Sequence, residues 1–311
     1  MHELPNLLAF CVAMPIRLQP ALIPSHIDGF LVKTDLRLSR FSIVGQTAPT
    51  PAQAEQGRAE LELSLSLRGQ AHILVGNQRL TMQPQSMLWV RPSQPHLIID
   101  ASPDCLAWVI VFRKRLVRRV CTSPDARVLQ ATGSQDVLLR RLPQTEVNAL
   151  SSLYAGIPIG AGRDVFNAGL GYALARSYQA FQSAPAAPNL DAVHPAVRAA
   201  AWLLRDGQAG LSNEALAARV GLSAQRLSRL FKAQTGSNLA DFRNRQRIAQ
   251  TVARLAEGER NLTGLALDAG FGSYSQFHRV FKQHMGQGPA AYLRQLGREL
   301  RHRPTAKPVP P

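Results

Sequence analysis

The sequence predicts an α+β protein of two domains, an N-terminal antiparallel β-barrel or jelly roll with a helical segment behind it, and a C-terminal all-α domain. The chain has 311 residues, which is long enough for two separate cores. Between residues 29 and 112, short apolar or alternating runs recur at intervals of about 8–12 residues, as in small all-β domains. Near the C-terminus, the run A-Q-R-L-S-R-L-F-K (224–232) recurs as Y-S-Q-F-H-R-V-F-K (274–282). Each copy follows a short helical run and a glycine, so the repeat predicts two helix-turn-helix units.

The N-terminal strands are predicted from alternation and turn residues. Residues 60–67 read E-L-E-L-S-L-S-L, the pattern of a half-buried strand. Gly76-Asn77 is typical of a hairpin turn between two such runs. We therefore expect strands at residues 60–67, 71–75, 78–82, 87–90, 97–99 and 106–112, within a domain that spans residues 24–125.

Helical spacing follows this β-rich region. Residues 114–120 form a short basic helix, and residues 146–154 and 165–181 are amphipathic. The second of these carries an apolar stripe of Leu170, Leu174, Tyr178 and Phe181. The remaining boundaries are an N-terminal arm (1–23), a helical segment (126–182), a Pro-rich linker (183–194), a helical domain (195–297) and a disordered basic tail (298–311). The start codon is either Met1 or Met14, and the N-terminus is a poor signal peptide because it lacks a basic region.

The C-terminal helices are punctuated by capping residues. Pro195 suits the first position of a helix, and Ser212 and Ser223 are expected to cap the next two. Gly236 stops the second of these, and a helix of about 18 residues then runs to Glu257. Thr263 is expected to cap a short helix, Ser273 and Gln276 to form a capping box, and Pro289 to start a last helix that ends near residue 297.

The charge of the chain favours a polyanionic partner. The formal net charge is +16, and residues from 190 onward hold 18 Lys/Arg against 8 Asp/Glu. The excess therefore lies where the repeat lies, and double-stranded DNA is the expected partner. Arg reads guanine and Gln reads adenine in the major groove, while Ser, Lys and helix N-termini suit phosphates. The residues expected to face DNA are Gln225, Ser228, Arg229 and Lys232 in the first copy, and Tyr274, Ser275, His278, Arg279 and Lys282 in the second.

The helix between the two copies sets their spacing. About 18 residues span roughly 27 Å, which suits two recognition helices in adjacent major grooves about 34 Å apart. Four arginines decorate this helix, and the sequence leaves open whether they contact DNA or form internal salt bridges: Arg243, Arg245, Arg247 and Arg254.

Residues 195–296 resemble the DNA-binding domain of the AraC/XylS family of bacterial transcription regulators. The resemblance rests on E-A-L-A-A-R-V-G-L-S (214–223), R-L-S-R-L-F-K-A-Q-T-G (226–236), L-A-L-D-A-G-F-G-S (265–273), F-H-R-V-F-K-Q-H-M-G (277–286), and on Pro289 and Tyr292. It implies two helix-turn-helix units joined by a long helix. The base-reading positions that it implies are Gln225, Ser228 and Arg229, then Tyr274, Ser275, His278 and Arg279. Gly288 stands where the family pattern has Ser before the proline.

Residues 68–96 are similar, more weakly, to the cupin-like sensor domain of such regulators, with Pro84-Gln85-Ser86 in place of P-G-D. The resemblance implies a small-molecule effector inside the barrel and dimerisation through the helical segment. Candidate residues lining the effector site are Arg37, Phe41, Trp89, His96 and Trp108. A catalytic cupin needs two or three His plus a carboxylate, whereas this region offers only His72 and His96, so we expect no metal, cofactor or catalytic site.

Three functions follow from these observations. The leading one is a cytoplasmic, nucleoid-associated DNA-binding regulator, an activator gated by a small molecule, which contacts RNA polymerase as the family does and does not bind membranes. The second is a regulator whose N-terminal domain only dimerises or binds a protein partner. The third is an enzyme fused to a DNA reader, which the positions of Cys11, Cys105 and Cys121 disfavour because none lies in a C-x-x-C or P-C-H-R motif.

Overall fold

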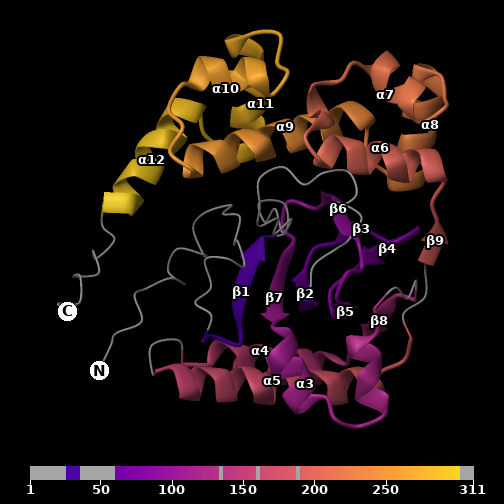
Figure 1. Cartoon of the computed structure of the whole chain (residues 1–311), viewed down its shortest axis with the longest axis vertical. Helices are drawn as coiled ribbons and strands as arrows, with labels where there is room; N and C mark the ends of the chain where they lie inside the picture. Colours follow the sequence, from indigo (N-terminus) through magenta and orange to yellow (C-terminus); the bar gives the residue numbers. More distant parts are fainter. Residues whose placement is uncertain (1–25, 36–59, 133–135, 159–161, 187–189, 302–311) are drawn as a thin grey trace.

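The β-rich N-terminal domain lies between two sets of helices. The computed structural model describes residues 26–35, 60–132, 136–158, 162–186 and 190–301. In Figure 1, helices α3, α4 and α5 lie below the strands, and the C-terminal helices lie above them. The predicted arm, Met14, Cys11, Arg37 and Phe41 fall outside the described residues, as does the tail beyond residue 301.

The strands form two antiparallel sheets, as the predicted jelly roll requires. Sheet A has five strands in the order β1-β7-β2-β5-β8, and sheet B has four in the order β6-β3-β4-β9. Sheet A contains β1 (Gly29–Asp35), β2 (Leu61–Arg68), β5 (Ser86–Val90), β7 (Leu106–Phe112) and β8 (Leu138–Arg141). Sheet B contains β3 (Ala71–Val75), β4 (Gln78–Met82), β6 (His96–Ala101) and β9 (Leu190–Ala192).

Turn residues fix the register of these strands. Gly76 has φ 57° and lets β3 and β4 pair with Val75 opposite Gln78, as the hairpin signal predicts. Gln85 has φ 75°, so it takes the left-handed conformation at the position where the family pattern has Gly. Its backbone N–H donates to the carbonyl of Ser66, and the hydroxyl of Ser86 accepts from the N–H of Gln83. The turn is therefore kept without its glycine, at the modest cost of a left-handed non-glycine residue.

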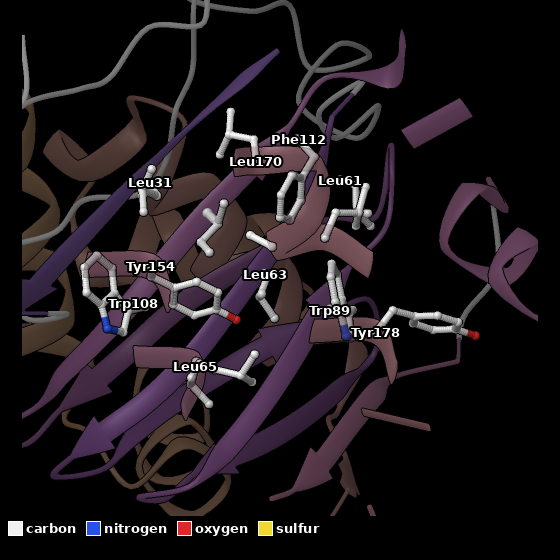
Figure 2. Close-up of a cluster of buried hydrophobic side chains, with 14 of the residues drawn as sticks. Leu31, Leu61, Leu63, Leu65, Trp89, Trp108, Phe112, Tyr154, Leu170 and Tyr178 are labelled. Carbon is white, nitrogen blue, oxygen red and sulfur yellow. The ribbon is translucent and has the colours of Figure 1, made fainter. Parts of the chain in front are cut away.

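Both faces of sheet A are buried. One face packs on sheet B through a cluster that includes Val32, Leu88 and Val109. The other packs on the helices through Leu61, Leu63, Trp89, Trp108 and further residues, shown in Figure 2. Trp89 and Trp108 therefore lie on the helix side and do not line the space between the sheets, contrary to the sequence-based expectation. Every residue of β5 is buried, so alternation alone could not show which side each faces.

The helices below sheet A are α3 (Lys114–Val120), α4 (Gln144–Ala155) and α5 (Arg163–Ser183), with a short 3-10 helix at Asp125–Gln130. The stripe of Leu170, Leu174, Tyr178 and Phe181 is buried in the cluster between α5 and sheet A. Two arginines of α3, Arg115 and Arg119, pair with the buried carboxylate of Asp28, the second at 2.8 Å. These contacts fasten the basic helix to the start of β1.

Three strands were missed by sequence reasoning, the first being β1, which precedes all the predicted strands. β8 lies in the segment predicted to be helical, and β9 lies in the segment predicted to be a linker. Both are short and owe their conformation to pairing with distant strands, β8 with β5 and β9 with β4. The chain thus crosses from one domain to the other as a strand of sheet B.

The C-terminal domain consists of seven helices, numbered as in Figure 1: α6 (Pro195–Arg205), α7 (Asn213–Arg219), α8 (Ala224–Thr235), α9 (Leu239–Ala256), α10 (Leu262–Asp268), α11 (Tyr274–Met285) and α12 (Pro289–Arg301). Ser212, Ser223 and Ser273 accept hydrogen bonds from the backbone three residues on, as predicted. Gly236 ends α8 with φ 77°.

Three local predictions in this domain were wrong. The cap of α10 is Asn261, whose side-chain Oδ1 accepts from the N–H of Gly264. Thr263 lies inside the helix. The side chain of Gln276 accepts from the N–H of Gly272 rather than from that of Ser273, so only half of the capping box forms. α12 continues to Arg301 instead of ending near residue 297. In the described part of the chain, no helix is both long and apolar enough to cross a bilayer.

Candidate nucleic-acid interface

The first helix-turn-helix unit presents one side of α8 to solvent. Leu227 and Phe231 are fully buried, and the ring of Phe231 lies 5.4 Å from that of Phe242 on α9. Since a helix repeats every 3.6 residues, the opposite side must face outward. Gln225, Arg229 and Lys232 are exposed there and Ser228 is half-buried.

The second unit repeats this arrangement on α11. Phe277, Val280 and Phe281 are buried against α9, α10 and α12. The outward residues are Ser275, His278, Arg279 and Lys282, which are exposed, and Tyr274, which is half-buried. The Tyr274 ring lies 5.8 Å from that of Phe277, so the core of the unit anchors it.

The structure thus brings the nine predicted residues together in two outward sets, one on each recognition helix. The first set holds two cations and the second holds two cations and a histidine. Cationic and amide side chains on exposed helix faces are what phosphate and base contacts require. Their individual contacts with DNA remain predictions.

Helix α9 joins the two units and belongs to both cores. Leu239 and Phe242 pack in the first, while Ile248, Val252 and Leu255 pack in the second. Its 18 residues span roughly 27 Å. The spacing of the two recognition helices is therefore fixed by one continuous helix packed at both ends.

Three of the four arginines of α9 make contacts within the protein. The Nε of Arg247 donates to the carbonyl of Ala209 at 2.9 Å, and Arg254 pairs with Asp268 at 2.7 Å. Arg243 is only 8% exposed, and burial lowers its pKa. Arg245 bonds to the N-terminal domain. Three of the four arginines thus make intramolecular hydrogen bonds or ion pairs, whereas Nε and Nη2 of Arg243 are buried without a hydrogen-bond partner among the described residues.

An apolar interface joins the first unit to sheet B. Leu74, Leu97 and Ile99 of sheet B are buried in the same cluster as Val197 of α6 and Phe231 of α8. The described members of the second unit's cluster all come from the C-terminal domain. The N-terminal domain therefore shares a core with one recognition helix and not with the other.

Polar contacts reinforce this interface at two places. Arg245 donates to the carboxylate of Asp100 at 2.8 Å and to the carbonyl of Ile99 at 2.7 Å. Arg79 of β4 donates to the carbonyl of Gln234 at 2.9 Å, close to the C-terminus of α8. A cation at the C-terminus of a helix is favourable because the last carbonyls lack partners there.

A histidine lies beside these contacts. The Nδ1 of His72 is 3.0 Å from the hydroxyl of Thr81 and 3.5 Å from Arg79. Burial, followed by the charge of Arg79, lowers the pKa of His72, and Asp100 opposes this shift. Sequence reasoning missed the roles of Arg79, Asp100 and Arg245, since residues so far apart in the chain give no local signal of contact.

The three described effector candidates, Trp89, His96 and Trp108, lie in different surroundings. His96 lies 3.5 Å from the buried carboxylate of Glu62. Trp89 packs against Phe112 and Tyr178, and its indole N–H has no hydrogen-bond partner among the described residues. Trp108 donates to the hydroxyl of Ser151 on α4.

Comparison with known proteins agrees with both halves of this architecture. Residues 13–158 match the family model of an AraC-binding-like domain, and residues 216–295 match that of a helix-turn-helix domain. The chain is 30% identical over 83 residues to the probable transcription factor PqrA of Proteus vulgaris, a match that covers 27% of this chain and 68% of PqrA. The chain belongs to the AraC/XylS family. It is a DNA-binding transcriptional regulator.

Further relatives and solved structures are similar to this chain. Regulatory protein SoxS of Escherichia coli K12 is 28% identical over 96 residues, which are 31% of this chain and 90% of SoxS. Among solved structures, ToxT of Vibrio cholerae O395 is 16% identical with a TM-score of 0.35, over 78% of this chain and 91% of ToxT. The DNA-binding domain of AdpA in complex with a target DNA is 27% identical with a TM-score of 0.32, over 35% and 97% of the two chains.

Proposed function

We propose that this regulator is an activator that reads two neighbouring turns of DNA with α8 and α11. The observation that carries the proposal is the pair of exposed, cationic helix faces held by α9. The DNA-binding residues are the nine named above, and all of them except Lys232 and Lys282 are placed to read bases. Arg229 and Arg279 occupy equivalent positions of the two units. A footprint on a selected operator tests it. Protection should cover two major-groove segments about 10 base pairs apart, and a single protected segment would contradict it.

We further propose that a small-molecule effector of the N-terminal domain changes DNA binding through the interface with the first unit. Sheet B holds α8 by a shared core and by Arg79, so a shift of sheet B acts directly on one recognition helix. Energetically, an effector acts only through its different affinity for the two arrangements. The footprint should therefore change when an effector binds.

The search for that effector requires the full chain. A fragment of residues 1–182 lacks β9 and exposes Leu74, Leu97 and Ile99, which are buried against α6 and α8. A thermal-shift screen of the whole protein against a metabolite panel should give a saturable rise in Tm with one chemical class. No rise with any compound would favour the second candidate.

The second candidate is a regulator whose N-terminal domain only dimerises or binds a protein. The observation in its favour is the filled space between the sheets. In the described residues, that space holds apolar side chains such as Ile73, Leu80, Met82 and Val90, all at most 4% exposed. Side chains that are so closely packed leave little room for a metabolite, although the contact of His96 with Glu62 adds one polar pair to this space.

A homodimer through α5 fits either candidate. The outward side of α5 carries Val165, Ala168, Tyr172 and Ala175, all exposed, at the spacing of a coiled-coil seam. Val165 is 52% exposed and Tyr172 is 61% exposed. Sedimentation should show a dimer that Tyr172→Glu converts to a monomer, while Ser152→Glu, at an exposed position of α4 outside this seam, leaves it intact.

We propose no catalytic activity for this chain. Its relatives are transcription regulators, and burial raises the pKa of the Cys121 thiol to about 11, which keeps it protonated and poorly nucleophilic at neutral pH. An activator located with the nucleoid in the cytoplasm acts on RNA polymerase. In vitro transcription with purified polymerase tests this, and repression in that assay would overturn the assignment as an activator.

A further inference from the structure

The start of α12 lies against the outward side of α11. Gly288 directly precedes α12, and its carbonyl accepts the N–H of Tyr292. A Cβ placed on Gly288 would lie 2.8 Å from Nε2 of His278 and 3.5 Å from its Cδ2 and Cε1. The imidazole of His278 therefore occupies the space that any other residue at position 288 would need.

The backbone of Gly288 gives no other reason for a glycine. Nine glycines of the described chain have positive φ, and Gly288 is not among them. A serine at this position would add a cap to α12, as in the family pattern. The chain forgoes that cap, and the contact with His278 supplies the physical reason.

A second contact holds the ring from the side of α11. The centroid of the His278 ring lies 6.3 Å from that of Tyr274, at an interplanar angle of 46°. Tyr274 is itself packed on Phe277 in the core. His278 is exposed, and an exposed side chain ordinarily exchanges rotamers within nanoseconds. In the structure, the ring of Tyr274 and the backbone at Gly288 flank the imidazole in this one orientation.

We propose that Gly288 is a positioning residue for DNA recognition by the second unit. By leaving room for the imidazole, it holds His278 in one orientation beside Arg279 before DNA arrives. A side chain that is already ordered loses less conformational entropy on binding. The proposal rests on the proposed contact of His278 with DNA and adds the residue that orients this contact.

A double-mutant cycle in the full chain tests the proposal. The probe is a DNA duplex of about 30 base pairs, obtained by in vitro selection on the wild-type protein, and affinity is measured by fluorescence anisotropy. Gly288→Ala should weaken binding roughly 2- to 10-fold, the range expected for ordering one side chain. In a His278→Ala background, the same substitution should have almost no effect, because no ring is left to displace.

Controls separate this effect from a loss of structure. Gly210 also has an ordinary φ, and a Cβ there would meet nothing within 4 Å, so Gly210→Ala should leave affinity unchanged. The Tm of Gly288→Ala should match that of the wild type, since the displaced atom is the end of an exposed side chain. The histidine Cε1 proton of His278 should shift in the NMR spectrum of this variant.

Each other outcome overturns a distinct claim. If His278→Ala binds like the wild type, His278 makes no contact with DNA, and both this contact and the role of Gly288 are wrong. The proposal that the two units read DNA is tested separately, by the variants of Arg229 and Arg279. If His278→Ala weakens binding and Gly288→Ala does not, only the positioning role is wrong. An equal loss from Gly288→Ala in both backgrounds would trace the effect to the backbone of α12.

Discussion

Replacing Arg245 by alanine should loosen the first unit from the N-terminal domain without unfolding either. Among the described residues, the guanidinium donates to the carboxylate of Asp100, to the carbonyl of Ile99 and to the hydroxyl of Ser237. The first two cross between the domains. The apolar contacts of Leu74 and Ile99 remain in the variant, so we expect more frequent opening rather than full separation.

The expected loss of free energy at the domain interface follows from the two bonds that cross it. A hydrogen bond to a charged group contributes about 1.5–3 kcal/mol, and an exposed ion pair about 1 kcal/mol or less. The Asp100 side chain is 37% exposed, so we assign its bond with Arg245 the value of an exposed ion pair. The bond to Ile99 counts toward the higher value, since its loss strands a carbonyl. Together they give roughly 2–4 kcal/mol, or a roughly 30- to 1,000-fold rise in the opening equilibrium.

Hydrogen–deuterium exchange of the full chain measures this opening. The reporting amides are those of β9, which pair with β4, and that of His194, which donates to Gln234. Arg254→Ala is the matched control, because Arg254 lies on the same helix and pairs with Asp268 inside the second unit. Faster exchange in Arg245→Ala alone is the expected result. Equal exchange in the two variants would refute the assignment of Arg245 to the domain interface.

Three further outcomes can be measured. Arg229→Ala or Arg279→Ala should weaken operator binding by about 1–3 kcal/mol in a gel-shift titration. Arg163→Ala, which removes the same charge from α5, should not weaken it. Wild-type affinity in both recognition variants would contradict the proposal that α8 and α11 read the DNA. Phe281→Ala should lower the free energy of unfolding of the second unit by about 3–5 kcal/mol in a denaturant titration. If the substitution lowered this free energy by less than a substitution of an exposed residue does, the core position of Phe281 would be contradicted. His72 has a lowered pKa in the folded protein, so folding favours its neutral form and stability should fall as the pH drops from about 7 through 6.5. Melting curves between about pH 7.5 and 5.5 should show this fall, His72→Gln should flatten it, and an equal slope in both proteins would assign the pH dependence to other groups.

Local patterns predicted much of this fold. The strands Ala71–Val75, Gln78–Met82 and Leu106–Phe112 match their sequence signals residue for residue. The serine caps of α7, α8 and α11 were equally readable, because a cap is decided by a side chain and a backbone group three residues apart. The outward sides of α8 and α11 followed from helical periodicity.

Features that depend on distant partners could not be read in this way. β9 is three residues long and is a strand only because β4 lies beside it. Trp89 and Trp108 sit in strands of a sheet that is buried on both faces, so alternation could not tell which face meets the helices. The pairing of Arg245 with Asp100 joins residues 145 positions apart, and an arginine on a helix of a basic domain looks the same whether it meets DNA or a carboxylate.

Helix α9 also has a mechanical consequence. Its first turns are fixed to the unit that sheet B holds, and its last turns carry the other recognition helix, with no break between them. It therefore acts as a lever roughly 27 Å long. A tilt of about 10° at the end near sheet B carries the far end through roughly 5 Å by simple trigonometry over that length, which exceeds the 3.4 Å rise of one base pair. A tilt of this size at sheet B would thus move α11 out of register with its groove.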